Sequence, residues 1–87
     1  MLEKIERIVR NSTSHQQKVV AIEEFSELIK EITKDLRYKQ SNILEEYCDC
    51  LIMLEQLKII YNLKDEEIEK MCNIKIKRTF ERLEIEE

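Results

Sequence analysis

The complete absence of glycine and proline constrains the fold of this 87-residue chain more than any other feature. Both residues commonly mark turns and strand ends, so a chain without them is expected to form long helices joined by short polar segments. Hydrophobic residues make up 43% of the chain and charged residues 39%, which is typical of helical bundles and too hydrophobic for a disordered segment. A chain this short buries only roughly 60–65% of its unfolded surface, so a metal or a partner chain is expected to add stability.

Apolar residues recur at three- and four-residue spacing in four segments, which predicts four amphipathic helices. The predicted helices cover residues 2–10, 15–38, 43–62 and 65–83, and residues 84–87 are expected to form a frayed acidic tail. We therefore predict an all-α, antiparallel helical bundle in a single domain spanning 1–87. Ser14-x-x-Gln17 and Asn42-x-x-Glu45 match capping boxes and predict where the second and third helices begin.

Two helices carry the apolar surface expected to form the core. The stripe on the second predicted helix consists of Val19, Ile22, Phe25, Ile29, Ile32 and Leu36. The third predicted helix is apolar on nearly all sides, and a helix of that kind is buried on nearly all sides. Its second apolar patch, Leu44, Leu51, Ile52 and Ile59, therefore predicts packing against another subunit, as a homodimer or homotetramer.

Two acidic pairs lie on the second and third predicted helices. Glu24 and Glu27 are three residues apart, as are Glu46 and Asp49, and the segment 28–45 separates the pairs. Because residues i and i+3 share a helix face, two antiparallel helices could direct all four carboxylates at one point. Placed at about 100° per residue, Glu46 falls inside the apolar arc of its helix. A carboxylate there is costly unless it is paired or bound to a metal.

Two explanations of these pairs stay open on physical grounds. Like charges at close range force some carboxylates to protonate, and a divalent cation in an all-oxygen site removes that conflict. The alternative is a solvated or salt-bridged face, in which the acids pair with Lys75, Arg78 or Arg82 of the last helix. Spacing alone does not decide, because 19 of the 87 residues are acidic and other pairs have the same spacing.

Several other classes of protein fit poorly. The net charge of -4 disfavours a nucleic-acid groove binder, and no apolar run is long enough to span a membrane. The first residues lack the apolar region of a signal peptide, so a cytoplasmic location is expected. In that reducing compartment Cys48, Cys50 and Cys72 are expected to be small buried thiols. With these scattered cysteines and His15, which is expected to be exposed, the chain lacks the ligands for a zinc site.

The acidic pairs and their surroundings resemble the motif of the all-alpha nucleoside triphosphate pyrophosphohydrolases, the MazG-like enzymes and their dimeric dUTPase relatives. The matching residues are Glu23-Glu24-x-x-Glu27, then the spacer 28–45, and then Glu46-x-x-Asp49. The stretches NILEEYCDCLIMLEQL and KIKRTFERL, with Gln17 before the first motif, are similar to the small phage or bacterial MazG-like subgroup. The resemblance covers about residues 15–83.

This resemblance implies an enzyme that hydrolyses a nucleoside triphosphate to the monophosphate and pyrophosphate. Nucleotide-pool cleaning and signalling both stay open as its biological role. It implies Mg²⁺ as the cofactor, with Mn²⁺ as a substitute. The metal ligands and catalytic carboxylates would be Glu24, Glu27, Glu46 and Asp49, supported by Glu23. The substrate would be held by Gln17 near the base or sugar and by Lys75, Arg78 and Arg82 on the phosphates.

The chain also departs from that family, and other functions remain open. It has no tryptophan near the first helix and no glycine before the last, so the preferred base is not predicted. The main alternative is a non-catalytic helical interaction or regulatory protein with a solvated acidic face, and an inactive homologue kept as a regulator is a related one. A di-iron carboxylate bundle is disfavoured, because that class uses Glu-x-x-His pairs and His15 is the only histidine.

Overall fold

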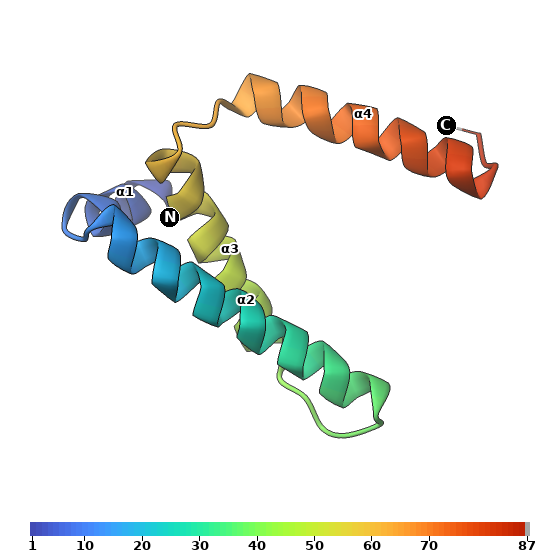
Figure 1. Cartoon of the computed structure of the whole chain (residues 1–87), viewed down its shortest axis with the longest axis horizontal. Coiled ribbons are helices and arrows are strands. Elements are labelled where there is room, and N and C mark those ends of the chain that lie inside the picture. Colours follow the sequence, from blue (N-terminus) through green and yellow to red (C-terminus); the bar gives the residue numbers. More distant parts are fainter. Residues whose placement is uncertain (87) are drawn as a thin grey trace.

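A computed structural model of the protein describes residues 1–86 and consists of four α-helices with no strand in that range (Figure 1). The helices are α1 (Leu2–Arg10), α2 (Ser14–Leu36), α3 (Ile43–Ile60) and α4 (Asp65–Leu83). The predicted all-α class and the four predicted helices are confirmed. Residues 84–86 follow α4 outside any helix, as expected for the tail, whose last residue lies outside the described range. None of the helices in 1–86 has the length and apolarity needed to cross a membrane.

The starts of α2 and α3 are set by local hydrogen bonds that differ from the predicted capping boxes. Thr13, one residue before the predicted cap Ser14, accepts a hydrogen bond at its Oγ1 from a backbone N–H of the first turn, at 3.1 Å. Asn42 is the N-cap of α3 as predicted. Its backbone N–H donates to Oε1 of Glu31 at 3.0 Å, the bond that a capping box would give to Glu45, while Glu45 accepts a hydrogen bond from the side-chain amide of Asn42.

The body of the molecule is an antiparallel pair formed by α2 and α3, with α1 packed against α3 near the end where α2 begins (Figure 1). Its buried apolar side chains are Ile5, Ala21, Cys50 and Met53, one from α1, one from α2 and two from α3. This is a thin core, as the length of the chain led us to expect. It holds together only the three helices that contribute to it.

The predicted core stripe of α2 is exposed in the chain except for Phe25, which is half-buried. Ile22 and Ile29 are 67% and 65% exposed, and Val19 and Ile32 are exposed as well. The helix instead packs through the face that carries Ala21, whose small side chain allows a close approach to α3. A helical wheel identifies the most apolar face of a helix, but it does not say which face a neighbouring helix covers. The prediction for this stripe was therefore wrong within a single chain.

The fourth helix extends away from the other three (Figure 1). It contributes no buried residue. Its predicted core-facing side chains are Ile68, Cys72, Ile76, Thr79 and Leu83, of which only Ile68 is half-buried and the others are exposed. These side chains do not face a core within the chain, because the joint after α3 directs α4 outward.

Candidate metal centre

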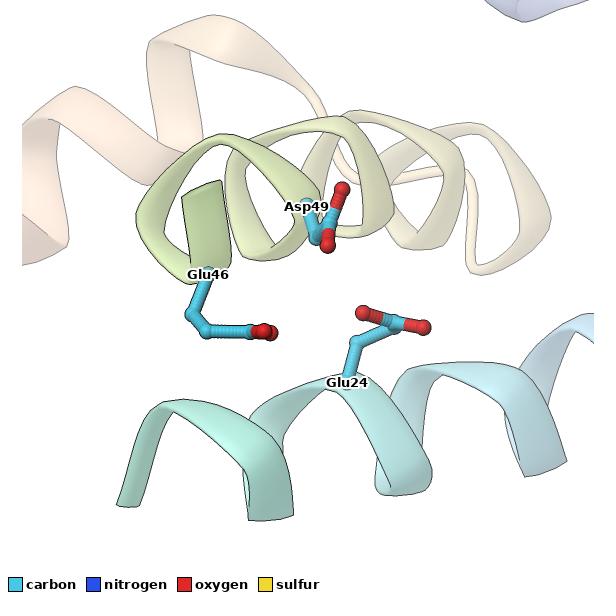
Figure 2. A group of neighbouring side chains, drawn as sticks. All are labelled: Glu24, Glu46 and Asp49. Atoms are coloured by element: carbon cyan, nitrogen blue, oxygen red, sulfur yellow. The ribbon is translucent and has the colours of Figure 1, made fainter. Parts of the chain in front are cut away.

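Three carboxylates converge between α2 and α3. Glu24, Glu46 and Asp49 each offer one carboxylate oxygen, and these oxygens all lie within 4.8 Å of one another. Figure 2 shows Glu24 extending from one helix toward Glu46 and Asp49 on the other. All three residues are half-buried. The structure thus brings together three of the four carboxylates that the sequence analysis placed on facing helices.

The fourth predicted carboxylate, Glu27, lies at the rim of this cluster. It is exposed, and it does not belong to the group whose oxygens lie within 4.8 Å. Its charge still acts on the cluster, because it helps to raise the pKa of both Glu24 and Glu46. Glu23 is also exposed, and its charge acts in the same direction on Glu24. Both residues therefore add negative potential without entering the centre.

The cluster contains more negative charge than the chain neutralises. Partial burial raises the pKa of Glu24 first, followed by the charge of Asp49 and a hydrogen bond with it. Partial burial also raises the pKa of Glu46, with the charges of Asp49, Glu24 and neighbouring acids adding to the effect. Oε2 of Glu46 is buried and has no hydrogen-bond partner among the described residues. Such an arrangement favours either protonation or a bound cation.

Cys50 links α3 to α2 beside the cluster. Its Sγ donates a hydrogen bond to the backbone carbonyl of Glu24 at 3.3 Å. Burial and the nearby carboxylates raise the pKa of this thiol, which keeps it protonated and able to donate. Cys50 is buried as predicted, whereas Cys48 and Cys72 are exposed, so the prediction of buried thiols was wrong for those two. The structure therefore reveals a supporting contact that the sequence analysis missed.

Gln17 also links α2 to α3. Its Nε2 donates to Oε1 of Gln56 at 2.8 Å, and Gln56 is only 3% exposed. Nε2 of Gln56 lies 3.4 Å from Sδ of Met53. The sequence analysis did not single out Gln56, although a lone amide between apolar neighbours on α3 was a usable signal. In this structure the Gln17 amide makes an interhelical contact, and its role toward a base or sugar stays a prediction.

The three predicted phosphate-binding residues are not near the carboxylates in this chain. Lys75, Arg78 and Arg82 are exposed on α4, which projects from the body (Figure 1). Within residues 1–86, salt bridges form between Glu31 and Lys34 and between Lys58 and two acids, but none involves the cluster. The described part of a single chain therefore leaves the carboxylates without a cationic partner.

Comparisons with protein-family profiles, with characterised proteins and with solved structures find no match to this chain. The three convergent carboxylates lie between two helices that Cys50 and Gln17 hold together, with Glu27 at the rim. These oxygens are the hard ligands that Mg²⁺ and Mn²⁺ prefer.

Proposed function

We propose that this protein is a Mg²⁺-dependent nucleoside triphosphate pyrophosphohydrolase, with Mn²⁺ as a substitute metal. One observation carries the proposal: Oε2 of Glu46 is buried, beside the carboxylates of Glu24 and Asp49, without a hydrogen-bond partner in residues 1–86. The donor set fits a hard divalent cation, because all three side chains offer oxygen and their negative charges are uncompensated. The substrate class is supported by the similarity of the two motifs to the pyrophosphohydrolases.

In this proposal different side chains have different roles in hydrolysis. Glu24, Glu46 and Asp49 would hold the metal, which supplies charge stabilisation on the phosphates and a more acidic water. Glu27, which stays outside the three-carboxylate group, would accept a proton from the attacking water. Lys75, Arg78 and Arg82 would offset charge on the departing pyrophosphate. Water cleaves the anhydride between the α- and β-phosphates, giving a monophosphate and pyrophosphate.

Pyrophosphate release from a panel of ribo- and deoxyribonucleoside triphosphates tests this proposal. We expect turnover with Mg²⁺, loss of turnover with a chelator and loss in Glu46→Gln. Glu45→Gln is the matched control, because Glu45 is the adjacent exposed acid on α3 and lies outside the cluster. Absence of pyrophosphate from every nucleotide, with a folded wild-type protein and either metal, would refute the enzyme proposal.

The exposed apolar surface favours a second candidate, a non-catalytic helical interaction protein. Ile22 and Ile29 on α2 are largely exposed, and α4 carries exposed Met71 and Ile76. Such a surface is typical of an interaction site. This candidate predicts that Mg²⁺ with nucleotide leaves the thermal melt unchanged and that Glu46→Gln behaves as wild type.

A further inference from the structure

The fourth helix lacks the packing that normally stabilises a helix. Most of the stability of a protein helix comes from burying an apolar face, yet α4 buries no residue in this chain. It nevertheless carries apolar side chains at helical spacing, among them Ile76 and Leu83, both at least half exposed. An amphipathic helix of 19 residues with an uncovered apolar face needs a partner surface.

The charges on this helix are segregated along its length. Its first residues, Asp65, Glu66, Glu67 and Glu69, are all acidic. Its second half carries Lys75, Lys77, Arg78 and Arg82 against one acid, Glu81. The carboxylate cluster between α2 and α3 has the opposite charge and no cation of its own within the described chain. The basic half of α4 and the cluster are therefore electrostatically complementary.

The joint between α3 and α4 holds this helix away from its own body. Asn62 adopts a left-handed conformation (φ 53°), and the backbone N–H of Leu63 donates to the carbonyl of Lys58 at 2.9 Å. This is the hydrogen-bonding pattern of a Schellman helix end. Nζ of Lys58 also lies 2.8 Å from Oδ1 of Asp65, the first residue of α4. These contacts direct α4 away from α3 of the same chain. We therefore expect the basic residues that lie against the carboxylate cluster to come from another chain.

The spacing along the two helices matches the basic residues to the carboxylates. Lys75 and Arg78 lie roughly three to four helical turns after the start of α4. Asp49 and Glu46 lie roughly three to four turns before the end of α3. Each interval is therefore about 15–21 Å along its helix axis, at a rise of about 1.5 Å per residue. If an α4 helix packed antiparallel along α3 and began at the C-terminal end of α3, these four side chains would lie at the same height along the α3 axis.

We propose that two copies of this chain exchange their α4 helices, so that the basic half of each α4 completes the carboxylate site of the other copy. The exchange covers the apolar face of α4 with exposed apolar residues of α2 and α3, and it is reciprocal about a two-fold axis. Lys75 and Arg78 then reach phosphates bound at the partner's carboxylates. This assignment of the phosphate-binding residues to a second copy rests on the proposed function.

Mixing two inactive variants tests the exchange. One chain carries Glu46→Gln with Asp49→Asn, and the other carries Lys75→Ala with Arg78→Ala. After the two chains are unfolded and refolded together, about half of the dimers are mixed, and each mixed dimer has one intact site. We expect pyrophosphate release to recover to about a quarter of the wild-type level. No recovery above the separate variants, with active wild type, would overturn the exchange, because sites built within one chain cannot be restored by mixing.

A second measurement works even if the protein has no pyrophosphohydrolase activity. In a mixture of ¹³C-labelled and unlabelled wild type, isotope-filtered NMR should detect nuclear Overhauser effects from Ile76 methyls of one copy to methyls on α2 or α3 of the other. Intrachain or α4-to-α4 contacts alone would overturn the proposal. In sedimentation, wild type should have twice the 10.6 kDa chain mass. Ile76→Glu should be monomeric, and Asn73→Glu is the exposed control. A monomeric wild type would also overturn it.

Discussion

Two glutamates on α2, seven residues apart, have opposite environments. Glu31 is 8% exposed, and its carboxylate accepts the backbone N–H of Asn42 at 3.0 Å and pairs with Nζ of Lys34 at 2.9 Å. The hydrogen bond from Lys34, followed by that from Asn42, lowers the pKa of Glu31. Glu24 faces Glu46 and Asp49 instead, and its pKa is raised. The same residue type on the same helix is thus stabilised as an anion in one place and destabilised in the other.

The difference separates a structural carboxylate from one suited to bind a ligand. Glu31 has its partners within the chain, and its bond to Asn42 ties α2 to the start of α3. The Glu24 cluster has no cationic partner among the described residues, so its charge can be neutralised only by protons, a metal or another molecule. Groups whose pKa values are shifted toward the neutral form by neighbours in a cleft are candidates for function.

The largest expected effect is on turnover. Glu24→Gln removes a proposed metal ligand, so we expect Mg²⁺-dependent pyrophosphate release to fall by about 100-fold or more. Glu31→Gln, the matched substitution two turns away, should leave turnover per folded molecule within about threefold. Initial rates at saturating Mg²⁺ measure both. Equal loss in the two variants would remove the functional distinction between them.

A second effect is the response of stability to the ligand. With Mg²⁺ and a non-hydrolysable nucleotide at about 100 times Kd, binding to the folded state adds about 2.7 kcal/mol. In a chain of this size that raises Tm by on the order of 10 °C. Thermal melts of Asp49→Asn should show no such rise, whereas Glu31→Gln should respond as wild type does. A wild-type Tm that does not change when Mg²⁺ and nucleotide are added would contradict a ligand site at the cluster.

A smaller effect, with opposite signs at the two positions, is expected on the metal-free fold. Glu24→Gln relieves repulsion with Asp49 and should raise Tm by a few degrees. Glu31→Gln loses an ion pair and weakens the hydrogen bond to Asn42, so it should lower Tm by several degrees. Both melts are recorded with chelator present. Destabilisation of similar size in both variants would indicate that the cluster is a structural network.

The smallest expected effect is the change of the metal-free Tm with pH. The raised pKa values of Glu24 and Glu46 mean that the folded state gains stability as these groups protonate, so metal-free Tm should rise as pH falls from 7 toward about 5. The lowered pKa of Glu31 contributes stability above the ordinary glutamate value, about 4.3, which is lost on further acidification. Glu24→Gln with Glu46→Gln should flatten the first change, and Glu31→Gln the second. A Tm that falls steadily from pH 7 in wild type would contradict this assignment.

The sequence predicted the helices well, because their signals are local. The missing glycine and proline and the regular apolar spacing gave four helices whose ends lie within two residues of those in the structure. The convergence of Glu24 with Glu46 and Asp49 also followed from i, i+3 spacing on two antiparallel helices. The half-buried state of Glu46 agrees with its place in an apolar arc.

The parts that the sequence did not predict depend on contacts between helices. A wheel placed Ile22 and Ile29 on the core face, yet α3 packs on the neighbouring face of α2 and leaves both exposed. The interhelical bonds of Gln56 to Gln17 and of Cys50 to the carbonyl of Glu24 were not predicted, because they depend on how α2 and α3 pack. Glu31 was not among the predicted site or core residues, and its importance follows from its bond to Asn42 at the start of α3.

The sequence by itself determined the helical class, the helix boundaries and the acidic residues able to meet between α2 and α3, because all of these follow from the periodicity of one helix at a time. The tertiary structure alone decided that Glu27 stays at the rim, that Glu31 pairs with Lys34 while Glu24 faces other carboxylates, and that α4 leaves the body. The physical reason is that packing faces, burial and charge pairing depend on distances between segments far apart in the chain, which no local pattern contains.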